Sequence, residues 1–117
     1  MARVADYSII ADGWVVEATQ DTVNFEVPST IDAGSRSILG FMLKTWNEDD
    51  MTLTLRLNGA KVWSWNYSDG ERVQYFQEVI AAGVVKPGAN VFSFDSSSGD
   101  FRLVQLSDIV VWWQANI

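Results

Sequence analysis

The segment LTLRLNGAKVWSWNY, residues 53–67, decides the fold of this chain. Its first half alternates leucine with polar residues up to Leu57, and its second half is an aromatic run that ends at Tyr67. Asn58-Gly59 lies between the halves, and this dipeptide favours a two-residue turn because both residues adopt positive φ at little cost. The segment therefore predicts an antiparallel β-hairpin.

Alternation of apolar and polar residues predicts strands on both sides of this hairpin. Apolar residues at i, i+3, i+6 and i+7 from Val73 instead follow a helical spacing, so one short helix is expected over residues 73–82. Together these elements predict an all-β antiparallel β-sandwich of jelly-roll type, with about eight strands and one short helical segment, in a single domain over residues 1–117. After a lead-in around Tyr7–Ile10, the expected strands are Trp14–Ala18, Thr22–Val27, Ser37–Thr45, Met51–Leu57, Lys61–Tyr67, Val91–Asp95 and Leu103–Gln114.

The composition excludes several classes of function. The chain has 15 acidic and 8 basic residues and a net charge of −7, which disfavours nucleic acid and anionic membranes as partners, because both bind through clustered lysine and arginine. It contains no cysteine and no histidine, so disulfides, thiol chemistry, Ser-His-Asp catalysis and zinc-hydrolase mechanisms are excluded. We expect no cofactor.

Targeting signals are also missing from the pattern. The start, MARVADYSII, lacks the apolar core and cleavage site of a secretory signal peptide, and no apolar run is long enough to cross a bilayer. We therefore expect no signal peptide or transmembrane segment in this chain, and its localisation is left unknown.

Two segments carry a resemblance to a known superfamily. They are LNGAKVWSW, which contains the Asn-Gly turn, and YFQEVIAAGVVKPGANVFSF, in which a Lys-Pro-Gly turn introduces Asn90 and the strand after it. Their order resembles that of galactose-binding-domain-like jelly rolls, as in carbohydrate-binding modules and the sugar-binding domain of some glycoside hydrolases, and LSDIVVWWQ is similar to the last strand of such domains. The resemblance implies a β-sandwich that binds sugars or proteins or is purely structural, and it assigns no ligand residue because the ligand residues of the superfamily lie in variable loops.

The register of the hairpin decides where its tryptophans point. A two-residue loop pairs Thr54 with Trp63 and Thr52 with Trp65, so that Trp63, Trp65 and Tyr67 share the outer face with Arg56 as a flat platform on which sugars stack. A three-residue loop with a bulge at Gly59 shifts the pairing by one residue and turns Trp63 and Trp65 into the core. In a third arrangement, the first strands of the chain or a second copy of it cover this outer face, and the aromatics then serve as an oligomer interface.

One end of the sandwich gathers further polar and aromatic side chains. The hairpin runs from the acidic turn 47–50 to Asn58-Gly59 and back, which brings Trp46, Asn47, Asp49 and Tyr67 to the same end. Aromatics beside carboxylates and amides suit a sugar site, although acidic turns also occur simply as solvated loops. The candidate ligand-binding residues are Trp46, Asn47, Asp49, Arg56, Trp63, Trp65, Asn66 and Tyr67.

Other patterns are weaker candidates. The oxygens of 95–100 are spaced somewhat like a calcium loop, but the terminal glutamate of an EF-hand is missing, which favours a plain turn. Glu48 and Asp50 form a carboxylate pair with no sign of a cleft, so no enzyme is expected. Trp112 and Trp113 are expected to point to opposite faces of one strand.

The leading hypothesis is a non-catalytic binding module for carbohydrate, with lectin-like use of exposed aromatics and loop-end polar residues. The competing hypothesis is a structural or assembly protein that forms a homo-oligomer or docks on a larger protein partner.

Overall fold

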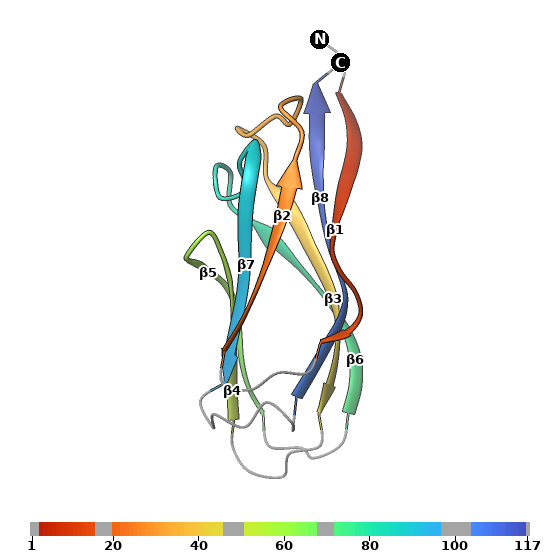
Figure 1. Cartoon of the computed structure of the whole chain (residues 1–117), viewed down its shortest axis with the longest axis vertical. Coiled ribbons are helices and arrows are strands. Elements are labelled where there is room, and N and C mark those ends of the chain that lie inside the picture. The colour runs from red at the N-terminus through yellow and green to blue at the C-terminus, as the bar shows by residue number, and fades with distance from the viewer. Residues whose placement is uncertain (1–2, 16–19, 46–50, 68–71, 97–103, 117) are drawn as a thin grey trace.

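The computed structural model describes residues 3–15, 20–45, 51–67, 72–96 and 104–116, which form two four-stranded antiparallel sheets (Figure 1). Sheet A has the strand order β1-β8-β3-β6, and sheet B has the order β2-β7-β4-β5. The strands are β1 (Arg3–Val15), β2 (Gln20–Val27), β3 (Ser37–Thr45), β4 (Met51–Leu57), β5 (Ala60–Tyr67), β6 (Arg72–Ile80), β7 (Gly88–Ser96) and β8 (Val104–Asn116). The prediction of an antiparallel β-sandwich is confirmed.

The expected short helix is wrong, because residues 72–80 form the edge strand β6. β6 pairs with β3 from Ser37 opposite Ile80 to Thr45 opposite Arg72. Val73, Tyr75 and Val79 are exposed, whereas Phe76 packs against the core, so the apolar residues serve both faces of a strand. Two alternating sets that overlap in this way mimic the spacing of a helix.

The first strand is also longer than predicted. β1 begins at Arg3 and ends at Val15, whereas the sequence placed its start at Trp14 and left Tyr7–Ile10 as a lead-in. Pairing with β8, from Arg3 opposite Asn116 onwards, extends the strand through residues without strong alternation. Residues 16–18, the rest of the expected strand, lie outside the described part.

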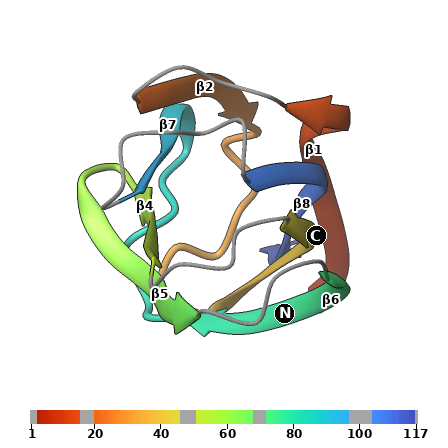
Figure 2. The ribbon, with the colours of Figure 1, turned by 90° about the horizontal axis from the view of Figure 1, so that it is seen from below.

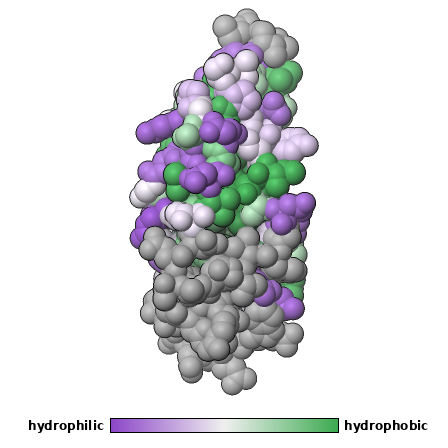
Figure 3. Space-filling model, in the orientation of Figure 1, coloured by the Kyte–Doolittle hydropathy of each residue, from purple (hydrophilic) through white to green (hydrophobic). Residues whose placement is uncertain are grey.

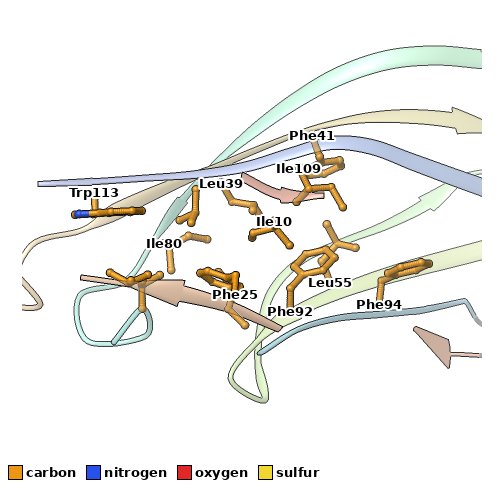
Figure 4. Close-up of a cluster of buried hydrophobic side chains, with 14 of the residues drawn as sticks. Ile10, Phe25, Leu39, Phe41, Leu55, Ile80, Phe92, Phe94, Ile109 and Trp113 are labelled. Carbon is orange, nitrogen blue, oxygen red and sulfur yellow. The ribbon is translucent and has the colours of Figure 1, made fainter. Parts of the chain in front are cut away.

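The core fills the space between the sheets (Figure 4). Alternate residues of each strand point inwards, which is the period that a sheet with one buried face imposes. Phe41 from sheet A and Phe92 from sheet B are fully buried, and so are the inward leucines of β3 and β4. These leucines are Leu39, Leu43, Leu53, Leu55 and Leu57.

Two asparagines join the hairpin turn to the turn before β7. Asn58 and Gly59 have φ values of 52° and 84°, as a two-residue hairpin turn requires. The Asn58 amide donates to Val84 O at 2.8 Å and to Asn90 Oδ1 at 2.7 Å, and its Oδ1 accepts from the backbone N of Val91 at 2.8 Å. Side-chain hydrogen bonds therefore join the two segments that carry the resemblance, the one with the Asn-Gly turn and the one with the Lys-Pro-Gly turn.

The edge strands of the two sheets lie beside each other on both sides of the sandwich (Figure 2). Figure 2 shows β5 and β6, the edge strands of the two sheets, as neighbours on one side, with β1 and β2 together on the other. Within the described ranges we find no helix with the length and apolar character that crossing a membrane requires.

Candidate functional site

The hairpin register combines features of two of the predicted alternatives. Leu57 lies opposite Ala60, so the turn has two residues, but the register then slips by one, and Leu55 lies opposite Trp63. Val62 is the extra residue of a β-bulge. Trp63 therefore faces the same side as the buried Leu55, as in the alternative with the shifted register.

The flat platform of exposed tryptophans is consequently not formed. Trp63 and Trp65 are half-buried and pack against the core, and the Trp63 ring centroid lies 5.1 Å from that of Phe41 and 5.2 Å from that of Phe76. The two indoles meet each other edge to face at 6.1 Å. Since aromatic pairs favour such tilted contacts, this cluster holds the Trp63 ring in place at the edge of the sandwich.

The polar candidates of the hairpin lie on the opposite face, the outer face of sheet B. Arg56 Nη1 lies 2.7 Å from Asp95 Oδ2 in an ion pair, and Asn66 donates to Thr52 Oγ1 at 3.1 Å. The structure thus separates Arg56 and Asn66 from the two tryptophans. Tyr67 ends β5, but its side chain lies outside the described part, as do Trp46, Asn47 and Asp49.

A pocket opens where the edge strands of the two sheets meet, and we call it the seam pocket. It has a volume of about 370 Å³ and is open to solvent. β6 contributes Glu78 from sheet A, and the bulged start of β5 contributes the rest from sheet B. Its lining residues are Lys61, Val62, Trp63, Ser64 and Glu78.

The charged groups of the seam pocket are available to a ligand. Neither Lys61 nor Glu78 forms an ion pair or a side-chain hydrogen bond with any described residue. The pocket therefore has a three-proton donor and a carboxylate acceptor among its lining residues, together with Trp63. The sequence analysis missed Glu78 because it placed this residue in a helix. Phe76, Glu78 and Ile80 occupy every second position, which is the spacing of one face of a strand, and this spacing was the signal that would have identified Glu78.

A second concavity lies at the end of sheet A where β3 begins. It has a volume of about 430 Å³ and includes Arg36, Ile38, Val79 and Gln114. Ser35 Oγ beside it donates to Asp32 Oδ2 at 2.9 Å, and Asp32 also forms an ion pair with Arg3 at 3.0 Å. These contacts tie the loop before β3 to β1, so we assign this polar cluster a structural role.

The weaker candidates gain no support as sites. In the calcium-like segment, Asp95 forms an ion pair with Arg56 and Ser96 is the last residue of β7. Residues 97–100 lie outside the described part, as do Glu48 and Asp50. Among the described residues no three carboxylates gather in a way that would hold a metal ion. Trp113 is buried and Trp112 is half-buried on the outer face of sheet A, which confirms that the two point to opposite faces.

No protein-family model matches the sequence, and neither does any curated protein. Solved structures share its fold. A chain of dimeric latent PorU from Porphyromonas gingivalis matches with a TM-score of 0.70 at 12% identity, over 97% of this chain and 13% of that chain. The C-terminal domain of EclA, described as a sugar-binding protein, matches with a TM-score of 0.53 at 8% identity, over 95% of this chain and 79% of that one.

An exo-beta-1,3-galactanase from Phanerochaete chrysosporium matches with a TM-score of 0.52 at 15% identity, over 95% of this chain and 27% of that chain. This chain therefore spans only a small part of the PorU and galactanase chains. At such identities the likeness establishes the fold alone. The likeness therefore supports the antiparallel β-sandwich fold that the two turn segments implied.

Proposed function

We propose that this chain is a non-catalytic carbohydrate-binding module that binds a sugar in the seam pocket. One observation carries the proposal: Trp63 borders an open pocket between Lys61 and Glu78, whose charged groups have no described partner. A sugar ring has an apolar C–H face and hydroxyl groups around its edge. A site that binds it therefore needs an aromatic surface for the face and hydrogen-bond donors and acceptors for the hydroxyls. Two proteins with this fold are described by sugar binding or sugar cleavage, so carbohydrate is the ligand class to test first.

Each group in the pocket has a distinct part in recognition. The part of Trp63 that borders the pocket contacts the C–H face of the sugar, while the Lys61 ammonium donates to a hydroxyl oxygen and the Glu78 carboxylate accepts from a hydroxyl. A pocket of about 370 Å³ lies near the small end of ligand sites, which span roughly 300–1,000 Å³. It suits one or two sugar rings, and we expect millimolar to micromolar affinity for so small a contact.

The carboxylate count of the pocket favours binding over turnover. Glycoside hydrolysis commonly uses two carboxyl groups that flank the scissile bond, roughly 5–9.5 Å apart. Among the described residues that line the seam pocket, Glu78 is the single carboxylate. A sugar held there lacks the second carboxyl group that this mechanism uses, so we expect it to be released unchanged.

The loop-end residues Trp46, Asn47, Asp49 and Tyr67 remain sequence-based candidates for the same function. Trp46, Asn47 and Asp49 follow β3 in the chain and Tyr67 is the last residue of β5, whereas the seam pocket is lined by the first residues of β5 and by Glu78. A Trp46→Ala variant therefore separates a site at the strand ends from a site at the seam.

Binding is tested with matched variants. We would titrate wild-type protein with a panel of soluble glycans by calorimetry and tryptophan fluorescence, and then compare Lys61→Gln and Glu78→Gln. Matched controls are Lys86→Gln and Glu26→Gln, which change exposed residues outside the pocket. We expect one glycan to bind, both seam variants to weaken it at least about tenfold, and both controls to leave it unchanged.

Two results would overturn the proposal. Absence of binding by any glycan at roughly 10 mM would exclude the carbohydrate function. If Lys61→Gln and Glu78→Gln still bind the glycan, the binding site is not the seam pocket. If Trp46→Ala is the one variant that loses binding, the site lies at the strand ends. Circular dichroism of every variant establishes that the fold is retained.

A further inference from the structure

The middle of the outer face of sheet A carries apolar side chains from all four strands. The register sets Tyr7, Trp112, Ile38 and Val79 side by side in one row, and Ile9, Val110, Gly40 and Gln77 in a second row. We call these two rows, with Val73 and Tyr75 beside them, the apolar face. Tyr7 and Ile9 are 56% exposed, and Val79 is 54% exposed. Figure 3 shows hydrophobic side chains reaching the surface at mid-height, on the side of β1.

The outer face of sheet B is polar and provides an internal comparison. β2 presents Thr22, Asn24 and Glu26 there, and β4 presents Thr52, Thr54 and Arg56. Among the described residues, Val91 is the single exposed large hydrophobic residue of sheet B, at 39%. In an antiparallel sandwich, the face of a sheet that points away from the core is ordinarily solvated and polar, as it is in sheet B. The fold itself therefore does not require the apolar surface of sheet A.

Gly40 makes the centre of the apolar face flat. A Cβ atom at this position would lie 2.7 Å from Trp112 Cζ3 and would clash with the Tyr75 hydroxyl. The absence of a side chain lets Trp112 from β8 and Tyr75 from β6 lie over the backbone of β3. The result is a surface that is largely apolar, with Gln77 and the Tyr75 hydroxyl hydrogen-bonded to each other within it at 3.3 Å, and it is suited to packing against another flat surface.

The exposed area is close to what half of a dimer interface needs. Six side chains of the apolar face are 41–56% exposed. At roughly 200 Å² for each fully exposed large side chain, they leave on the order of 600 Å² in water. Standard interfaces bury about 800 Å² per partner, and half-buried Trp112 and Val110 add to the area available here.

Charged residues flank the apolar face at both ends, and no charged residue occupies either row. Arg36, which is exposed and has no described ion-pair partner, lies two positions before Ile38 at one end of the rows. At the other end Asp108, two positions before Val110, is exposed and accepts a hydrogen bond from Ser107 Oγ at 2.9 Å, and Lys44 lies opposite Val73. Two copies stacked with antiparallel strands bring the Arg36 end of one over the end of the other that carries both Asp108 and Lys44, so shape and apolar area, more than charge, favour a second copy as the partner.

We infer that the apolar face binds the same face of a second copy, so that the protein forms a symmetric dimer in which two copies of sheet A pack face to face. The polar face of sheet B stays in solvent. The seam pocket opens between β5 and β6, so the dimer leaves it free, and the inference does not depend on the proposed function.

One matched pair of substitutions tests this inference. Val79→Glu places a carboxylate in the first row of the apolar face, and Val91→Glu makes the same change on the outer face of sheet B. Sedimentation equilibrium at roughly 100 µM gives the mass of each protein in solution. We expect wild type and Val91→Glu to approach twice the 13.1 kDa monomer mass, and Val79→Glu to remain at the monomer mass.

A monomeric wild type, a dimeric Val79→Glu, or a monomeric Val91→Glu would each overturn the inference. Circular dichroism establishes that Val79→Glu is folded. If it is not folded, Tyr7→Lys takes its place, because Tyr7 belongs to the same row but lies on the other edge strand of sheet A.

Discussion

Replacing Asn90 with alanine removes the central connection between the two turns that define this fold. Asn90 is 1% exposed. Its amide donates to Lys86 O at 2.7 Å and to Gly88 O at 3.0 Å, and its Oδ1 accepts from Lys86 N at 2.9 Å and from Asn58 Nδ2 at 2.7 Å. Alanine makes none of these four hydrogen bonds.

The size of the loss follows from these contacts. A hydrogen bond contributes about 1 kcal/mol net, and a buried group left without a partner costs about 1–3 kcal/mol. Part of the loss is offset, because alanine has no amide to desolvate and the turns relax towards water. We therefore expect Asn90→Ala to lower the free energy of unfolding by about 3–4 kcal/mol, out of a total of roughly 5–15 kcal/mol for a domain. At about 4 °C per kcal/mol, Tm falls by roughly 12–16 °C.

Urea unfolding followed by tryptophan fluorescence measures this loss directly. Asn66→Ala is the matched control, because Asn66 is exposed and its side-chain amide donates to Thr52 Oγ1 at the edge of the sheet. We expect the control to change the free energy of unfolding by less than about 0.5 kcal/mol. A loss below about 1 kcal/mol for Asn90→Ala would refute the argument that the two asparagines hold the turns together.

Two further predictions concern single contacts. Gly40→Ala places a Cβ against Trp112 and Tyr75. Urea unfolding should show that the free energy of unfolding falls by about 1 kcal/mol, a small loss because both rings are able to tilt towards solvent. An unchanged near-ultraviolet circular dichroism spectrum would contradict the close approach of these rings to Gly40. Arg56→Met breaks the ion pair with Asp95, in which the two side chains are 37% and 40% exposed. The free energy of unfolding should therefore fall by less than about 1 kcal/mol, and the difference should shrink as salt is added. A loss above about 2 kcal/mol would contradict this expectation, because it would show that the pair behaves as a buried one.

The turns and most strands of this protein were predictable because their signals are local. Asn58-Gly59 favours positive φ by itself, and the leucines of Met51–Leu57 alternate within one strand. Ser37–Thr45 was predicted with the bounds that the structure has. Each of these signals is contained in fewer than about ten residues, so no distant contact was needed to interpret it.

The helix prediction was wrong because the spacing of residues 73–80 fits two periods. Val73 and Val79 serve the outer face of sheet A, and Phe76 and Ile80 serve the core. Pairing with β3 along nine residues supplies the backbone hydrogen bonds of a strand, and this pairing is invisible in the local sequence.

The sequence by itself determined an all-β chain, the hairpin turn at Asn58-Gly59, the turn before Asn90 and the opposite orientation of Trp112 and Trp113. Tertiary structure alone decided which side chains of different strands come together on one face. The bulge at Val62 turns Trp63 towards Phe41 and Phe76, because burying the indole against the core stabilises that register. The seam pocket and the apolar face likewise join residues of separate strands, and long-range pairing between strands, which no local pattern encodes, brings them together.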